Sequence, residues 1–319
     1  RHLTGSTAGL DVNQNVLDPR YFSQGSALNQ AVANPFFGKG GTGVIGGATM
    51  QAFRLLLPYP TYGNVVFMST DLNHSHYDSL IIKGQKRFSK GLSFLSTFTW
   101  AKSHDLASVG NVTMPGPSGL QNPFSVEAEY APSNWQPVRT LATAFLWEMP
   151  FGKGKPFANN NRALDYVVGG WQINGVNTMR SGFPISINQS QNLNAAYGYA
   201  GQRPNATGVS PVTSGNLHDR LNGYINPAAF FTAPQFTFGN LARILEMRGP
   251  GLAQWDMSLF KNIPIRETLS AQFRLEALNA FNTPYFGGPN NSFGTAAFGR
   301  ITSQVNIARQ LQLALKIIW

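Results

Sequence analysis

The sequence predicts an all-β protein: an antiparallel transmembrane β-barrel, of which this chain supplies the C-terminal part with about seven or eight strands. Three observations predict this fold. Segments of about ten residues alternate apolar and polar side chains, short and long connections alternate along the chain, and charged residues are scarce. A period of two is the repeat of a β-strand, and ~9 to 11 residues is the length of a tilted membrane-spanning strand.

Charged residues make up only 12% of the 319 positions, about half the share usual for soluble domains. A barrel wall needs fewer charges, because its outer band contacts lipid and its inner face can be polar without being ionised. The net charge of +10 comes from scattered Lys and Arg with no basic run, which argues against nucleic acid as a partner. Anionic lipid and the sugar phosphates of lipopolysaccharide fit this charge better.

The chain has no cysteine, so a disulfide framework and a Cys-ligated metal site are excluded. No apolar run reaches the ~18 to 20 residues of a spanning helix. The chain opens with RHLTGSTAGL, which has neither an initiator Met nor a signal-peptide pattern. Either a signal peptide has been removed or, as we expect, the chain is the tail of a longer polypeptide whose secretion signal lies upstream.

Residues 1–74 have weak periodicity and many turn-forming residues, which predicts a mostly extracellular loop. The barrel strands and their loops then occupy 75–319, so that 1–319 is one partial barrel domain. Two alternating segments, 77–88 and 92–102, flank a short Ser-Lys-Gly turn and predict the first hairpin.

A Gly-, Pro- and Asn-rich loop at 103–137 leads to the next predicted strand, 139–148. A turn region begins at 149–157, and a strand with less regular faces follows at 170–187. The longest loop runs over 188–251. A structureless loop of about sixty residues is rare in a compact soluble domain, whereas long outside loops are typical of an outer-membrane barrel.

Two further strands are predicted at 252–263 and 268–282, joined by a short turn at 264–267. The second contains good helix formers, but its strict alternation from Leu269 to Ala277 favours a strand over an amphipathic helix. Counted back from the C-terminus, the short turns all fall on one side of the wall, which predicts short periplasmic turns and long extracellular loops. Only a closed barrel pairs all the backbone groups of strands in lipid.

The last strand lies within 304–319, where every second residue from Leu311 is apolar. We expect this apolar set to form the lipid face of a closing strand and the signal read by the barrel-assembly machinery. Its members are Leu311, Leu313, Leu315, Ile317 and Trp319. An aromatic ring at the end of such a strand is typical of the membrane interface.

Three charged residues are candidates for the barrel lumen: Asp256, Arg274 and Glu276, on the polar faces of neighbouring predicted strands. A functional interpretation is contact with a plug or a passing solute. The favoured interpretation is an ion-pair ladder that stiffens the wall.

Four tryptophans fall near predicted strand ends, as expected for the aromatic girdles of a membrane barrel. They are Trp100, Trp147, Trp171 and Trp255. The alternative, ordinary core aromatics of a soluble sheet, is disfavoured by the low charge and the loop asymmetry.

Other polar pairs give no catalytic prediction. His74 and His76 resemble half of a Zn or Cu site, but no third ligand is nearby in the sequence. Glu127 and Glu129 have the same spacing and are interpreted as solvated loop carboxylates rather than an acid–base pair. With no nucleophile motif either, we expect no enzyme activity, no metal and no cofactor.

The sequence resembles the C-terminal half of the barrel of Oar-like TonB-dependent receptors of the Gram-negative outer membrane. Six segments carry the resemblance: residues 33–38, 55–65, 77–103, 169–187, 273–286 and 298–319. The resemblance implies a barrel of about twenty-two strands with a plug, and upstream a TonB-box that contacts the TonB complex. The plug and N-terminal domains are absent from this sequence.

The first functional hypothesis is therefore part of a TonB-dependent receptor that imports a bulky solute, such as an oligosaccharide, peptide or chelate. Capture would lie in loops 103–137 and 188–251, which are rich in Tyr, Phe and Asn. An outer-membrane adhesin or surface-assembly barrel without transport is the first alternative. A soluble all-β binding module is the second.

Overall fold

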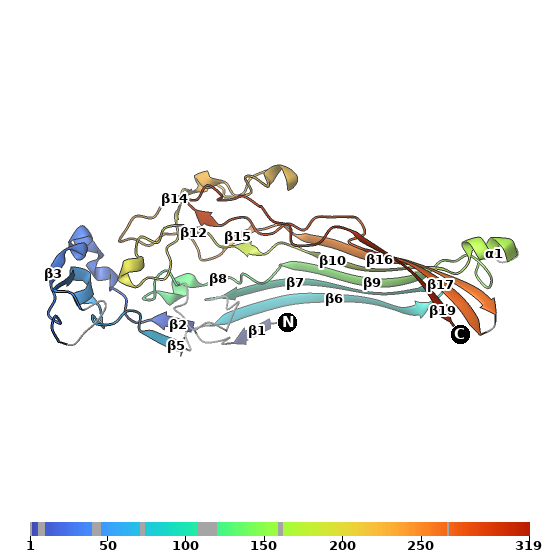
Figure 1. The fold of residues 1–319 in the computed structure, drawn as a ribbon, viewed down its shortest axis with the longest axis horizontal. Coiled ribbons are helices and arrows are strands. Elements are labelled where there is room, and N and C mark those ends of the chain that lie inside the picture. The colour runs from blue at the N-terminus through green and yellow to red at the C-terminus, as the bar shows by residue number, and fades with distance from the viewer. Residues whose placement is uncertain are drawn as a thin grey trace.

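The computed structural model describes residues 2–5, 10–39, 46–70, 74–106, 120–158, 162–266 and 268–319. Parts of the predicted loops 1–74 and 103–137, and Glu267 in a predicted turn, lie outside these residues. Figure 1 shows the chain as a long curved sheet at one end and a layer of loops at the other.

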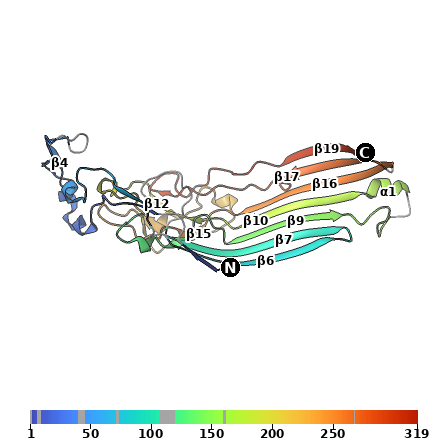
Figure 2. The same ribbon diagram turned by 90° about the horizontal axis from the view of Figure 1, so that it is seen from below.

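One antiparallel sheet carries the alternating segments of the sequence. Along its path the strands follow the order β1-β6-β7-β9-β10-β16-β17-β19, and the short β8 pairs with β7. Their bounds are β1 His2–Gly5, β6 Ser75–Ser89, β7 Leu92–Asp105, β8 Ala131–Pro132, β9 Arg139–Glu148, β10 Trp171–Arg180, β16 Leu252–Arg266, β17 Leu269–Leu278 and β19 Gln310–Ile318. Figure 2 shows the long strands side by side and nearly parallel to the long axis, in the order β6, β7, β9, β10, β16, β17 and β19. The eight strands of the path match the predicted number.

Several predicted boundaries were wrong. The strand predicted at 170–187 ends at Arg180, after which Pro184–Ile185 forms a separate short strand, β11. The final strand begins at Gln310, where the strict alternation begins, and not at residue 304. The predicted strand at 268–282 is β17 and contains no helix, so the helical alternative is excluded.

Short turns join the strands at one end of the sheet. Lys90 and Gly91, both at positive φ, connect β6 to β7. A Cβ on Gly91 would lie 3.0 Å from the carbonyl oxygen of Glu148, so glycine suits both the turn and the neighbouring strand. The β9–β10 turn, residues 149–170, is longer and contains the helix α1, Arg162–Val168, which the sequence did not predict.

The other end of the sheet carries a layer of loops with short strands and 3₁₀ helices (Figure 1). The strands are β2 Leu10–Asn13, β3 Ala31–Ala33, β4 Thr49–Gln51, β5 Val66–Thr70, β11, β12 Asn188–Gln189, β13 Asn205–Ala206, β14 Phe230–Phe231, β15 Leu245–Arg248 and β18 Ser292–Phe293. The 3₁₀ helices are η1 Pro19–Asn29, η3 Ala52–Leu56, η4 Val126–Glu129, η5 Ala195–Tyr197, η6 His218–Arg220 and η7 Pro227–Ala229. We call this part the loop layer.

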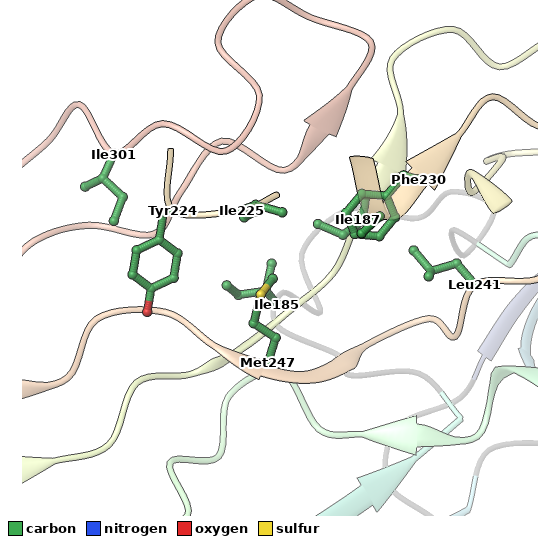
Figure 3. Packing of buried hydrophobic residues seen from close by; sticks show 9 residues of the cluster. Ile185, Ile187, Tyr224, Ile225, Phe230, Leu241, Met247 and Ile301 are labelled. Atoms are coloured by element: carbon green, nitrogen blue, oxygen red, sulfur yellow. The ribbon is translucent and has the colours of Figure 1, made fainter. Parts of the chain in front are cut away.

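The hydrophobic core lies in the loop layer. One cluster gathers side chains from distant loops, as Figure 3 shows: Ile185, Ile187, Tyr224, Ile225, Ala229, Phe230, Leu241, Met247 and Ile301. A second cluster packs Val16, Leu17, Leu28, Phe53 and Leu57 against Tyr197 and Tyr199. The loop predicted as structureless at 188–251 is therefore packed.

The N-terminal region is divided between the two parts. β1 pairs with β6 at the edge of the sheet, whereas residues from Asn13 onward pack in the loop layer. Among the helices of the described residues, none has the length and apolar character needed to cross a membrane.

Candidate functional site

The strand register sorts the side chains of the sheet into two faces, because paired residues of antiparallel strands lie on the same face. On one face Leu275 pairs with Leu259 and Leu313, and the neighbouring pairs are also mostly apolar. This apolar face includes Leu80, Ile82, Phe94, Phe98, Trp100, Leu141, Phe145, Trp147, Trp171, Ile173, Met179, Trp255, Met257, Leu259, Lys261, Ile263, Ala271, Phe273, Leu275, Ala277, Leu311, Leu313, Leu315 and Ile317, with a few polar side chains such as Ser96 and Asn177 between them.

The opposite face is mainly polar and uncharged. Thr97 and Thr99 of β7 lie on this face together with Gln172, Asn174 and Ser258. Asn174 donates to the Ser258 hydroxyl across the strands at 3.2 Å. A face of this kind, with amides and hydroxyls between a few charged groups, is suited to lining water.

Asp256, Arg274 and Glu276 all lie on this polar face, as their register partners show. Glu276 pairs with Ser258 and Gln312, and Arg274 pairs with Phe260 and Ala314. The prediction that they share one face of two adjacent strands therefore agrees with the register.

The favoured ion-pair ladder was wrong. In the part of the chain that the structure describes, no ion pair joins these three side chains. The Arg274 guanidinium lies 4.8 Å from the centre of the Phe260 ring and donates to Gln272 at 2.6 Å. Asp256 instead accepts the backbone N–H of Asn279 at 2.8 Å, because it lies two residues along β16 from Ser258, the register partner of Glu276.

The four predicted tryptophans all lie on the apolar face, in two groups. Trp147, paired with Leu92, and Trp171 lie near the turn end of the sheet. Trp100, paired with Arg139, and Trp255 lie near the loop layer. From residue 92 to residue 100 the strand rises about 26 Å, or roughly 20 Å of membrane thickness at a tilt of ~40°.

The last strand exposes its apolar side chains. Leu311, Leu313 and Leu315 retain 64%, 67% and 68% of their accessible surface, and Trp319 retains 90%. Phe273 and Leu275 on the paired strand continue this surface. A contiguous apolar surface of this kind marks a contact with lipid or with another protein.

A buried ion pair joins the two long loops. Arg203 donates to the Glu129 carboxylate from both terminal nitrogens, at 2.6 and 3.1 Å, and the two side chains are 8% and 1% exposed. Gln121 donates its backbone N–H to the same carboxylate and accepts the backbone N–H of Arg203 at 2.7 Å. The interpretation of Glu129 as a solvated loop carboxylate was therefore wrong.

A second ion pair ties this network to the sheet. Arg243 donates to the Asp105 carboxylate at 2.5 Å and to the backbone oxygen of Glu129 at 2.8 Å. Asp105 is the last residue of β7, so the loops are fixed to a strand end. Sequence reasoning missed Arg203, Gln121 and Arg243, because isolated polar residues in Pro- and Gly-rich loops carry no periodic signal.

The histidines have partners other than a metal. Tyr130 lies stacked between His74 and His104, with ring centres 5.2 and 5.6 Å away. His76 pairs with Asp78 at 2.7 Å, and Glu127 lies 3.9 Å from His74. Within the described residues, no group of three or more His, Cys, Asp or Glu is placed to hold a metal ion.

A cavity of about 550 Å³ opens where β6 and β7 meet the loop layer. Its lining combines the Trp100 ring with charged and amide side chains: Asp78, Lys102, Gln136, Glu246 and Arg248. Aromatic and convergent polar groups around a cavity of this size are typical of small-molecule sites. A smaller cavity, of about 270 Å³, is lined by Phe183, Tyr285, Phe286 and Asn291.

Buried tyrosines hold the loop layer together. Tyr199 donates to the Leu17 carbonyl at 2.5 Å, and Tyr224 donates to the Arg248 carbonyl at 2.7 Å. Burial raises the pKa of both phenols above the ordinary value. These hydroxyls are therefore neutral donors over a wide pH range.

Residues 11–312 match the family model described as "Outer membrane beta barrel domain". The chain belongs to this outer-membrane β-barrel family. Its membership confirms the predicted transmembrane barrel and its location in the outer membrane, and the hypothesis of a soluble binding module is wrong.

Other comparisons give a partial likeness. No curated protein matches the sequence. This outer-membrane barrel chain is similar to solved structures of P. aeruginosa FpvA bound to heterologous pyoverdines (11% identity, TM-score 0.32, 81% of this chain and 20% of that chain). It is also similar to FpvAI in complex with pyocin S2 (12% identity, TM-score 0.32, 91% and 23%). The chain spans about a fifth of the length of either.

Proposed function

We propose that this chain forms wall strands and outer loops of an Oar-like TonB-dependent receptor that imports a bulky solute across the outer membrane. The six sequence segments that resemble such receptors support the proposal, as does membership of an outer-membrane barrel family. Coupling to the TonB complex would need a TonB-box and a plug from other parts of the protein. The solute belongs to one of three classes: oligosaccharide, peptide or chelate.

The observation that carries the proposal is the Arg203–Glu129 network between the two long loops. A loop that is ordered before binding loses less conformational entropy when a ligand arrives. Gln121 and Arg243 extend the network to both loops and to the end of β7. The loop layer is therefore built as a fixed surface, which suits capture of a defined solute.

The polar face of the sheet is the second feature that supports a transport function. We place it on the lumen side, with Asp256, Arg274 and Glu276 as the charged groups that a plug or a passing solute contacts. Gln272 and Phe260 hold the Arg274 guanidinium in place. The amides and hydroxyls between these charges suit a wall that a polar solute slides past.

We propose that the apolar face contacts lipid and that the last strand also serves as an assembly signal. The exposed leucines of β19 contact lipid, and Trp319 lies at the periplasmic interface as part of the signal for the barrel-assembly machinery. The tryptophan pairs at the two ends mark the aromatic girdles. Residues 1–74, apart from β1, belong to the extracellular side, where lipopolysaccharide surrounds the loops.

Transport is tested in cells that express the full-length protein. Labelled oligosaccharides, peptides and ferric chelates are offered one class at a time, and accumulation is measured with and without a protonophore. The proposal expects one class to accumulate, and accumulation to stop when the proton gradient is removed.

Two outcomes count against it. Surface binding that no protonophore changes would favour an adhesin or surface-assembly barrel. Unchanged uptake after deletion of the loops at 103–137 and 188–251 would show that these loops do not capture the solute.

A further inference from the structure

The described parts of the β9–β10 turn, residues 149–158 and 162–170, expose apolar side chains. Phe157 and Val167 are 58% and 66% exposed, and Phe151, Leu164 and Tyr166 are 39%, 43% and 50% exposed. Such side chains are not needed to close a turn. Figure 1 shows this unit, with α1, beyond the ends of β9 and β10.

Close backbone packing fixes the two halves of the turn to each other. A Cβ on Gly152 would lie 2.4 Å from the Asp165 carboxylate and 2.6 Å from the Cα of Gly169, so only glycine fits there. Asp165 accepts the backbone N–H of Lys153 at 2.7 Å. The Phe151 and Phe157 rings lie 5.9 Å apart across a backbone bridge.

The turn is attached to the apolar face of the sheet. Trp171 donates its indole N–H to the Val167 carbonyl at 2.8 Å, and Lys261 donates to the carbonyls of Val167 and Gly169. Trp171 and Lys261 are register partners on that face. The C-terminal part of α1 therefore lies against the apolar face, next to the turn-end tryptophan Trp171.

Basic side chains gather at the same end of the sheet. Lys155 is paired with Glu148 at 2.6 Å, whereas Lys153 uses only its backbone in the packing of the turn. Lys90 lies in the neighbouring β6–β7 turn, where the Cβ position of Gly91 approaches the Glu148 carbonyl oxygen at the end of β9. Lysines beside exposed aromatic and aliphatic groups are typical of a segment that lies in an anionic membrane interface.

We propose that the β9–β10 turn lies in the membrane interface and inserts the side chains of Phe157, Leu164 and Val167 among the anionic phospholipids of the periplasmic leaflet. The short turns of such barrels face the periplasm, and the apolar face leads directly into this unit. Continuity with the lipid-facing wall and charge complementarity both identify a lipid surface as the occupant. The inference does not depend on the transported solute.

The test uses spin labels at single cysteines: these 319 residues contain no cysteine, and any cysteine elsewhere in the full-length protein is first replaced by serine. Val167→Cys and Leu164→Cys are each made in the full-length protein, labelled, and reconstituted in vesicles of phosphatidylcholine and phosphatidylglycerol. Leu313→Cys on the apolar face and Phe231→Cys in the loop layer are the matched controls, at 67% and 49% exposure. Accessibility to oxygen and to a water-soluble nickel chelate is then compared.

The proposal expects the labels at 164 and 167 to resemble the label at 313, with oxygen accessibility several-fold above that of the chelate. Labels at both sites that resemble the one at 231 would overturn it, since the turn would then lie in water. Replacing phosphatidylglycerol by phosphatidylcholine, or Lys153→Gln, is expected to shift both labels towards water. No shift in either experiment would overturn the role of anionic lipid.

Discussion

Arg203 and Glu129 lie 74 residues apart in the chain and form a buried bidentate ion pair that joins the two long loops of the barrel. Their hydrogen-bonding capacity is also used by Gln121 and by the Leu241 carbonyl, which accepts from Arg203 at 2.8 Å. A buried pair with this geometry costs much to desolvate, and it is most damaging when only one partner is removed.

The substitution Glu129→Ala leaves Arg203 buried and unpaired. We expect it to destabilise the loop layer by about 3–5 kcal/mol, the usual effect of breaking a buried pair. Hydrogen exchange of the loop amides measures the change. Glu127→Ala is the control, because its side chain is 77% exposed and we expect a change within about 0.5 kcal/mol. Equal effects at both positions would contradict a special role for Glu129.

Gly239 packs against the backbone of the same arginine, Arg203. A Cβ there would lie 1.9 Å from the backbone oxygen of Arg203, so Gly239→Ala must displace backbone. We expect a loss of about 1–3 kcal/mol in the loop layer, as for other overpacked sites. Gly223→Ala, where a Cβ meets nothing within 4 Å, is the matched control in the same thermal unfolding experiment. A loss as large in the control would show that flexibility rather than contact sets the cost.

The last strand is tested on its two faces. Leu315→Asp places a carboxylate on the exposed apolar face, whereas Gln312→Asp places the same group on the polar face. We expect Leu315→Asp to impair membrane insertion by somewhat less than the ~2–4 kcal/mol of a midplane Arg or Lys, and Gln312→Asp to have little effect. Membrane levels of the heat-modifiable folded form give the readout. Deletion of Trp319 is expected to resemble Leu315→Asp, and normal levels of both variants would refute the assembly role.

Alkaline pH is expected to loosen the loop layer before the sheet. Burial raises the pKa of the Tyr199 and Tyr224 phenols in the folded state. Because the folded state then binds more protons than the unfolded state, this stabilisation is complete below the unfolded pKa of ~10 and falls as the pH rises above it. Tyrosinate absorbance followed with loop proteolysis measures the effect. In the double variant Tyr199→Phe, Tyr224→Phe, we expect the stability of the loop layer to fall less steeply above pH ~10. A pH profile unchanged from that of the parent protein would assign the loss of stability to other titratable groups.

Local patterns were enough to predict the wall. Leu311, Leu313 and Leu315 alternate strictly, so their common face follows from strand geometry alone. The same rule correctly put Asp256, Arg274 and Glu276 on one face. It did not predict their partners, because the offset between β16 and β17 depends on a turn with a register shift between Pro264 and Arg266.

The β9–β10 turn shows a different limit. Helix α1 has only seven residues, too few for a helical period to stand out from a Gly- and Asn-rich sequence. Its position depends on the contact of Gly152 and Gly169 with Asp165, which joins segments without shared periodicity.

The sequence by itself determined that this chain builds an antiparallel membrane wall, approximately where its long strands lie, and which side chains share a face, because these follow from a period of two and from connection length. Only the tertiary structure decided that the long loops form a packed layer and that Glu129 is buried against Arg203. Those contacts join residues far apart in the chain. Their free energy depends on the desolvation of the buried charges and on the entropy of closing the loops, and no local sequence pattern encodes either quantity.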